Sequence, residues 1–563
     1  MKKALFYGFA AAGIVLLASC SAKLGRLTAD NFTVTPNPLE AQAGEVPATI
    51  NGMFPEKYMK KKAQVKVVPE LRYRTADGKQ AKAVGEGATF QGEKVLGNNQ
   101  TINYRIGGRY TMRTSFDYVP DMLQSDLYLT FVAHVGKKRV FVPSVKVAKG
   151  VVATSELYHR TLTQAQAAVA QDAFQRVIEQ KQEASIKFLI GQSQLRKNEL
   201  KNNSVQEFVR LLGEIARDQE TKILDEIEVS AYASPDGGYT TNEQLAFNRE
   251  DETTKYVDEQ LRKQNIDGPI DSKYTAEDWE GFKELVAASD IQDKDVILRV
   301  LSMYEDPEER EQQIKNISAA FRELADGVLP QLRRARMTVR YQLVGRNDEQ
   351  ILEQMRTDAS KLSVEEMLYS ATLYDNTADV EKAYRKTIEL YPTDARAYNN
   401  LATLAYAKGN YDEARTWLTK AQQANGNLAE AKANLGLLAL QSGDLEKAEE
   451  QIAGATDAHG IQEVLGNLHL AQGKYAQAEQ DFDKVYSNSA ALAQILNKNY
   501  SSAGITLKNI QNADATTDYL RAILAARTGR HTDASKMLRD AVAKDPSLAQ
   551  YAAKDLELAN VKK

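Results

Sequence analysis

Apolar and polar residues alternate along much of the first 150 positions of this 563-residue chain. A period of two is typical of strands that bury one face. Turn residues such as Asp77-Gly78 and Gly136-Lys137 separate the alternating runs. The alternating apolar positions are Val65, Val67, Leu71, Tyr73, Ile102, Tyr104, Ile106, Leu127, Leu129, Phe131, Val135, Val140 and Val142. Short strands at this spacing predict an immunoglobulin-like β-sandwich over residues 30–152.

The middle of the chain mixes strand and helix periods. An alternating run over residues 227–233 stops at a loop with Pro235 and Gly237, since Pro fixes φ and Gly permits positive φ. Helical spacing follows from Asn242, and a last alternating run ends at Leu343. This order predicts an α+β sandwich with helices on one sheet face.

The expected boundaries of this central region follow from the same patterns. The α+β domain spans residues 185–345, with a helical insert over about 264–330. Residues 163–184 contain no Pro or Gly and are rich in Ala and Gln. They therefore predict a connecting helix between the two domains.

The loop and helix after residue 231 carry a recognisable motif. The strand ends Ala231-Tyr232-Ala233-Ser234, and the helix reads Asn242-Glu-Gln-Leu245-Ala-Phe-Asn-Arg249-Glu250. This resembles the OmpA-type peptidoglycan-binding domain, whose helix has the form Asn-x-x-Leu-Ser-x-x-Arg-Ala. In that family an Asp and an Arg clamp a charged side chain of the peptidoglycan peptide.

The resemblance implies candidate peptidoglycan-binding residues at Arg249, Ser234, Asp236 and Asn242. Arg249 stands at the family's Arg position, whereas Ser234 replaces the Asp and Asp236 lies two residues further on. A neutral hydroxyl cannot pair with an ammonium group as a carboxylate does, which predicts weak or no binding of peptidoglycan. Arg249 also suits a surface ion pair, and Asn242 also suits a helix N-cap.

The last third of the chain repeats itself every 34 residues. Asn400-Leu401-Ala402 recurs as Asn434-Leu435-Gly436. The small residues Gly409, Ala414 and Ala421 recur as Gly443, Ala448 and Ala455. This period is that of the tetratricopeptide repeat and predicts an α-solenoid over residues 363–560, irregular around 485–515.

The resemblance places the first helix of each repeat pair on a concave face. The candidate groove residues are Asn399, Thr403, Tyr406, Leu437 and Gln441. Grooves of this kind bind peptides or helices, and we expect envelope proteins as partners. The alternative is that these positions pack internally or against the OmpA-like domain.

The N-terminus predicts export and lipid attachment. Lys2 and Lys3 precede a short apolar run, and residues 1–19 suit a cleaved signal peptide. The sequence Leu17-Ala18-Ser19-Cys20 matches the lipobox of bacterial lipoproteins, in which the Cys receives acyl chains such as palmitate. We therefore expect a membrane anchor at Cys20 and a tether over residues 20–29. Ser21 in place of Asp favours the outer membrane, and no acid-rich run follows, which favours its periplasmic face.

Composition excludes several functional classes. A net charge of −4 and a pI near 6 give no basic field for nucleic acid. The five His residues show no metal-ligand spacing, and the chain holds no nucleophile-elbow or phosphate-loop motif. We therefore predict no enzyme activity, no cofactor and no metal.

Three functional hypotheses remain open at this stage. The first is an outer-membrane lipoprotein that serves as a scaffold or tether of an envelope complex, with peptidoglycan as a further partner. The second is an accessory subunit of an outer-membrane assembly or secretion machine that no longer binds peptidoglycan. The third is an envelope hydrolase whose active site the motifs do not reveal.

Overall fold

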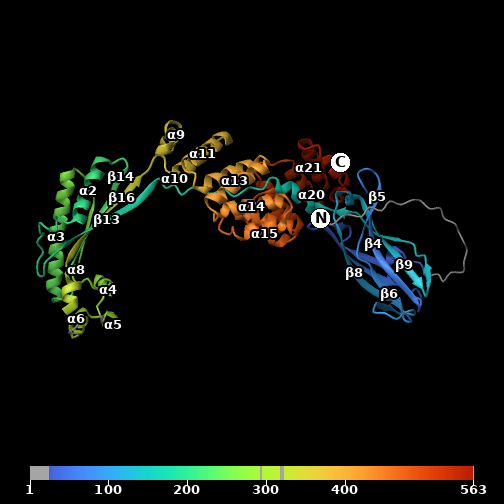
Figure 1. Cartoon of the computed structure of the whole chain (residues 1–563), viewed down its shortest axis with the longest axis horizontal. Helices are drawn as coiled ribbons and strands as arrows, with labels where there is room; N and C mark the ends of the chain where they lie inside the picture. Colours follow the sequence, from blue (N-terminus) through green and yellow to red (C-terminus); the bar gives the residue numbers. More distant parts are fainter. Residues whose placement is uncertain (1–23, 292–293, 317–321, 562–563) are drawn as a thin grey trace. The chain divides into compact units, whose positions relative to one another are not determined.

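The computed structural model describes residues 24–291, 294–316 and 322–561 (Figure 1). The predicted signal peptide and Cys20 lie outside these residues. The chain divides into two compact units. Unit 1 comprises Met1–Asp172 and Tyr374–Lys563, and unit 2 comprises Ala173–Leu373.

Unit 1 begins with a strand-rich part, here called the β-region, over residues 24–157. Its two larger sheets have the orders β1-β3-β8 and β10-β9-β4-β6-β7, with β5 and β11 also paired to the second, and β2 and β12 form a separate parallel pair. The strands are β1 (Phe32–Thr35), β2 (Leu39–Glu40), β3 (Glu45–Phe54), β4 (Ala63–Arg74), β5 (Gln80–Val84), β6 (Ala88–Gly92), β7 (Gln100–Ile102), β8 (Gly108–Asp117), β9 (Ser125–Val135), β10 (Lys138–Val140), β11 (Val145–Lys149) and β12 (Val151–Val152). Both sheets contribute to one apolar core.

Burial along β4 follows the predicted alternation, with Val65, Val67 and Leu71 fully buried. Ile106 differs from the prediction. It lies in the loop between β7 and β8 and is 82% exposed, because the strand ends at Ile102 and the chain turns at Gly107, where φ is +74°.

The repeat array completes unit 1. Its helices are α11 (Thr377–Leu390), α12 (Ala395–Ala407), α13 (Tyr411–Ala424), α14 (Ala429–Gln441), α15 (Leu445–Ala453), α16 (Ile461–Ala471), α17 (Tyr475–Asp481), α18 (Asn488–Leu496), α19 (Tyr500–Asn509), α20 (Ala515–Arg527), α21 (His531–Lys544) and α22 (Leu548–Lys554). Small residues let paired helices approach closely. A Cβ on Gly466 would lie 2.5 Å from the Phe482 ring, and one on Gly436 would lie 2.4 Å from Ile452.

The irregular stretch around 485–515 still forms a helix pair, α18 and α19. In four other pairs the turn between helices holds a Gly with positive φ, at Gly409, Gly443, Gly473 and Gly529. Lys498 takes that position here with φ of +63°. The loss of the Gly signal, rather than a loss of structure, makes the sequence pattern irregular here.

Unit 2 is an α+β fold. Its sheet has the order β13-β16-β14-β15, antiparallel except for the parallel pair β14 and β15. Helices α2 and α3 pack on one face over a core from all three long strands. The elements are β13 (Val177–Lys187), α2 (Asn203–Arg217), β14 (Lys222–Tyr232), α3 (Tyr239–Gln264), β15 (Ile270–Thr275) and β16 (Arg334–Val344).

The predicted connecting helix over residues 163–184 is not formed. Residues 165–175 follow an extended path, and Val177–Lys187 is strand β13. β13 pairs with β16 along its whole length, from Val177 opposite Val344 to Lys187 opposite Arg334. Tertiary hydrogen bonding overrides the helical propensity of Ala and Gln.

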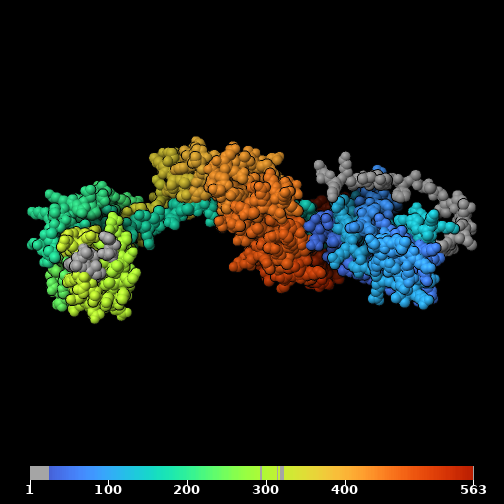
Figure 2. All heavy atoms as spheres, turned by 60° about the horizontal axis from the view of Figure 1, so that its bottom comes forward, coloured from blue at the N-terminus to red at the C-terminus, as the bar shows by residue number. Residues whose placement is uncertain are grey.

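The insert also differs from the prediction. Ile270–Thr275, inside the predicted helical insert, is the fourth strand of the sheet. The helices that follow have a small apolar core of their own (Figure 2, yellow-green). They include α4 (Trp279–Ala287), α5 (Lys294–Met303), α6 (Pro307–Asn316) and α8 (Leu329–Leu332).

The boundary before the array lies later than predicted. The helices α9 (Asp348–Thr357) and α10 (Val364–Ser370) belong to unit 2, and unit 1 resumes at Tyr374. Phe174 stacks on Tyr369 with ring centroids 4.6 Å apart, which ties α10 to the start of unit 2. In the described ranges no helix has the length and apolarity needed to cross a membrane.

Candidate protein-interaction groove

An extended segment of the chain lies along the first helices of the repeat pairs. We call residues 162–172 the strap; it begins at the last residue of α1 (Tyr158–Leu162) and is teal in Figure 1, beside the orange helices. The strap and the array both belong to unit 1. The face predicted to receive a partner therefore holds a part of the same chain.

Asparagine side chains of α12 and α14 bind the strap through its main chain. The Ala168 N–H donates to Asn434 Oδ1 at 2.7 Å, and the Ala168 carbonyl accepts from Asn399 Nδ2 and Asn434 Nδ2 at 2.9 and 2.8 Å. Asn400 contacts Ala170 in the same two-sided way, with both distances 2.8 Å. One carboxamide can satisfy a backbone donor and acceptor together, because it carries both groups.

The side chains of the strap that face the array are small. Ala165, Ala168 and Ala170 are 5%, 2% and 3% exposed, whereas Val169 between them points outward and is 42% exposed. An alternating extended chain with Ala on its inner face lets the backbone come close enough for the asparagine contacts. The groove thus recognises an extended backbone with small side chains.

Further polar contacts hold the N-terminal part of the strap. The Tyr406 hydroxyl donates to the Leu162 carbonyl at 2.9 Å. Asn488 Nδ2 donates to Gln164 Oε1 at 2.7 Å, and Gln164 Nε2 donates to Asp514. Contacts from α12 to α20 therefore fix the strap over most of the array.

Glu463 on α16 is a buried acid beside the strap. It is 5% exposed. Burial raises the pKa of Glu463 to about 7, while hydrogen bonds from Ser487, Asn467 and the Gln166 backbone lower it. The folded-state pKa lies above the unfolded value, so the folded chain keeps a proton that the unfolded chain releases.

Replacing Glu463 by Gln should therefore change the pH dependence of stability. With Glu463, the free energy of unfolding of unit 1 falls as pH rises from 4.5 to about 7. We expect Glu463→Gln to raise the free energy of unfolding of unit 1 by about 1–3 kcal/mol near pH 8 and to change this free energy little near pH 4. Thermal unfolding across this range measures the effect. Exposed Glu450→Gln is the control, and equal curves for both variants would contradict the prediction.

The predicted groove residues take different places. Asn399 and Tyr406 contact the strap. Thr403 donates to the Asn400 carbonyl of its own helix at 2.8 Å, and Gln441 donates to the Tyr411 hydroxyl at 2.5 Å. Leu437 is fully buried in the core of unit 1.

Sequence reasoning missed Asn400 and Asn434 as binding residues. It treated both as markers of the repeat. Asn467 continues the series one repeat later, and all three are almost completely buried. A polar residue that recurs on otherwise apolar helices is the signal that could have found them, since a buried carboxamide needs hydrogen-bond partners.

The residues of the predicted peptidoglycan clamp lie in unit 2. Arg249 on α3 is 1% exposed. Its guanidinium donates to the carbonyls of Gln192, Tyr232 and Leu189 at 3.0, 2.8 and 3.4 Å, and lies 5.2 Å from the Phe188 ring centre. Burial lowers the pKa of Arg249 to about 10, so the group stays charged at neutral pH.

The other clamp residues are also engaged within unit 2. Asp236 accepts from Ser234 Oγ at 2.5 Å and from Arg333 at 2.8 Å, and Arg333 also donates to Ser234 Oγ at 3.1 Å. Asn242 is 4% exposed and donates to the Gly237 carbonyl at 2.9 Å. The four residues lie around the end of β14, but each already has a partner inside the fold.

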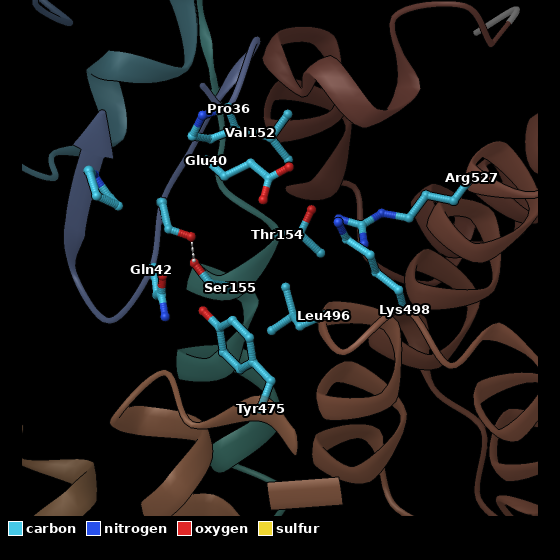
Figure 3. A pocket seen from close by; sticks show the side chains of 12 residues that line it. Pro36, Glu40, Gln42, Val152, Thr154, Ser155, Tyr475, Leu496, Lys498 and Arg527 are labelled. Carbon is cyan, nitrogen blue, oxygen red and sulfur yellow. Dashed lines mark hydrogen bonds between the residues drawn. The ribbon is translucent and has the colours of Figure 1, made fainter. Parts of the chain in front are cut away.

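A cavity of about 290 Å³ lies between the β-region and the array within unit 1 (Figure 3). Ser155 Oγ donates to the Ala41 carbonyl at 2.8 Å, and Arg527 donates to Glu557. Tyr475 points toward Ser155, and burial raises the pKa of its hydroxyl to about 12. Across the junction, Thr154 Oγ1 donates to Glu557 Oε1 at 2.6 Å. In the described ranges no group of three acids, His or Cys could hold a metal ion.

Family models identify the C-terminal helices. Models described as tetratricopeptide repeat match residues 383–416 and 433–494. The C-terminal part of the chain therefore holds tetratricopeptide repeats. No curated protein matches the chain.

Several solved structures resemble part of the chain. A tetratricopeptide repeat protein from Parabacteroides merdae is 14% identical, with 38% of this chain and 90% of that chain covered and a TM-score of 0.27. Pseudomonas aeruginosa pilF is 20% identical, with 36% and 96% covered and a TM-score of 0.27. Yeast Tom70 is 11% identical, with 63% and 82% covered and a TM-score of 0.24. These TM-scores are too low to support a functional comparison.

Proposed function

We propose that this protein is a periplasm-facing outer-membrane lipoprotein that acts as a scaffold of an envelope protein complex. Tetratricopeptide repeats suggest a scaffold for protein–protein interactions, and repeat proteins of this type are generally not enzymes. The lipobox at Cys20 supports attachment to the membrane. The strand order and one-sided helices of unit 2 are compatible with the OmpA-type resemblance.

The strap indicates how the groove of the array is used. A tethered segment binds at a high effective concentration, so a free peptide competes poorly for the same groove. We infer that the groove serves as an internal clamp, which joins the β-region and the array into one body. Protein partners then bind the outer surfaces of the array.

Crosslinking and co-purification from native membranes test the scaffold function. The full chain is compared with a variant that carries charge reversals on exposed outer helices, such as Lys420→Glu and Lys447→Glu. We expect these changes to reduce recovery of partners, with Asn427→Ala as a neutral control. Recovery of no specific partner by the parent chain would reject the scaffold function.

Cys20→Ala is expected to prevent lipid attachment. Acyl chains hold a protein in a bilayer through about 0.8 kcal/mol for each buried CH₂ group. The variant should leave the membrane fraction or remain unprocessed. Fractionation and metabolic labelling with a fatty acid measure this. A variant that is processed and fractionates with membranes as the parent does would show that another contact holds the protein.

The alternative is an accessory subunit of an outer-membrane assembly or secretion machine that does not bind peptidoglycan. The observation that favours it is Arg249, whose donors already serve backbone carbonyls. Sedimentation of the full chain with purified peptidoglycan separates the two proposals. The cell-wall scaffold is favoured if the parent chain sediments with peptidoglycan and Arg249→Lys sediments less while its unit 2 stays folded.

A further inference from the structure

Four loops lie together at one end of the β-region. They are residues 55–62, 92–97, 103–107 and 136–138, and we call them the basic end. Backbone hydrogen bonds join them: Lys94 N–H to Lys61 O at 2.7 Å, Gly136 N–H to Lys62 O at 2.9 Å, and Lys57 N–H to Tyr104 O at 2.6 Å. In Figure 1 this end lies near the labels β6 and β9, away from β5.

The basic end carries a strong positive charge. Eight cationic side chains stand there against two carboxylates, Glu56 and Glu93, although the whole chain has a net charge of −4. The cationic residues are Lys57, Lys60, Lys61, Lys62, Lys94, Arg105, Lys137 and Lys138. All except the half-buried Lys60 are exposed. Repulsion between this many like charges is unfavourable, and an anionic surface would offset it.

Two exposed apolar side chains project from the same loops. Leu96 is 101% exposed and Ile106 is 82% exposed. Each lies within two residues of a cation, Lys94 and Arg105. In a bilayer, cations can contact the phosphate headgroups while neighbouring apolar side chains contact the acyl chains. A folded acidic protein offers no such apolar layer below its charged surface.

The chain also enters the fold at this end. Gly25 lies against the Tyr58 ring in the first of the four loops, and Leu24 packs on the core of the β-region. Three residues lie between Cys20 and Leu24, so their Cα atoms are at most about 14 Å apart. A lipid on Cys20 would thus hold the basic end close to the bilayer.

We propose that the basic end binds the anionic phospholipid surface of the leaflet that carries the anchor. The lysines contact lipid phosphates, and Leu96 and Ile106 enter the boundary with the acyl chains. This inference rests on the proposed anchor for the choice of leaflet. The charge and the apolar tips predict binding even without the anchor.

Vesicle sedimentation tests the proposal with the chain from Ser21 onward, which has every described residue and no lipid. It should bind phosphatidylcholine vesicles that contain about one-third phosphatidylglycerol, should not bind pure phosphatidylcholine, and should lose binding in high salt. The variant Lys61→Glu/Lys62→Glu/Lys94→Glu should bind about a hundredfold less, from about fivefold for each Lys near the surface.

A matched variant keeps the net charge change the same. Arg74→Glu/Lys79→Glu/Lys149→Glu alters exposed cations elsewhere on the β-region and should bind nearly as the parent does. Leu96→Ser/Ile106→Ser should weaken binding but preserve its salt dependence. Equal binding to both vesicle types, or an equal loss in the two triple variants, would overturn the proposal. So would binding to a soluble polyanion but not to vesicles. None of these results depends on lipid attachment at Cys20. The proposed anchor and the proposed binding by the basic end can therefore be rejected independently.

Discussion

Asn434→Ala is expected to destabilise unit 1 by about 3 kcal/mol and to release the strap. The change removes the acceptor of the Ala168 N–H and one donor to the Ala168 carbonyl. It also removes the donor to Asn399 Oδ1 at 2.9 Å. A buried polar group left without a partner costs about 1–3 kcal/mol, and the strap then loses its main-chain partner.

Hydrogen exchange reports this effect at the strap itself. The amide of Ala168 should exchange much faster in Asn434→Ala, and the unit 1 thermal transition should fall. Asn427→Ala is the matched control on an exposed residue of the same repeat, and it should stay within about 0.5 kcal/mol of the parent. Unchanged exchange at Ala168 together with a control-like transition would show that the groove does not hold the strap.

Arg249→Ala is expected to destabilise unit 2 by about 3–5 kcal/mol. The substitution leaves the carbonyls of Gln192 and Tyr232 without their donors in a site that is 1% exposed. It also removes the cation next to the Phe188 ring. If the role of Arg249 were only to bind a ligand, its removal would leave the free energy of unfolding of unit 2 almost unchanged.

Two further variants make this result specific. Arg262→Ala lies on the same helix, where its partner is Asp258 and 79% of its side chain is exposed, so its effect should be within about 0.5 kcal/mol. Arg249→Lys keeps the charge and some donors and should cost less than Arg249→Ala. Suppose instead that Arg249→Ala lowers the stability of unit 2 no more than Arg262→Ala does, and that peptidoglycan binding is lost. Arg249 would then be a ligand-binding residue.

Elements with local sequence signals could be predicted from the amino-acid sequence alone. The 34-residue period from Asn400 to Asn434 predicted the repeats, because each repeat contacts chiefly its neighbours. Alternation at Val65, Val67 and Leu71 predicted which side of β4 is buried. The period of apolar residues reports local geometry directly.

Segments whose conformation depends on long-range pairing could not be predicted from the sequence. Residues 163–184 have the composition of a helix, yet one part pairs with β16 and another lies in the repeat groove. Their partners are between about 150 and 350 positions away, so no local pattern signals them. The same holds for Arg249: its position in a motif was visible, but the carbonyls that accept from it come from two distant segments, Leu189 and Gln192 in the turn after β13 and Tyr232 at the end of β14. Local preference for one backbone shape is weak, and hydrogen bonds from distant segments outweigh it.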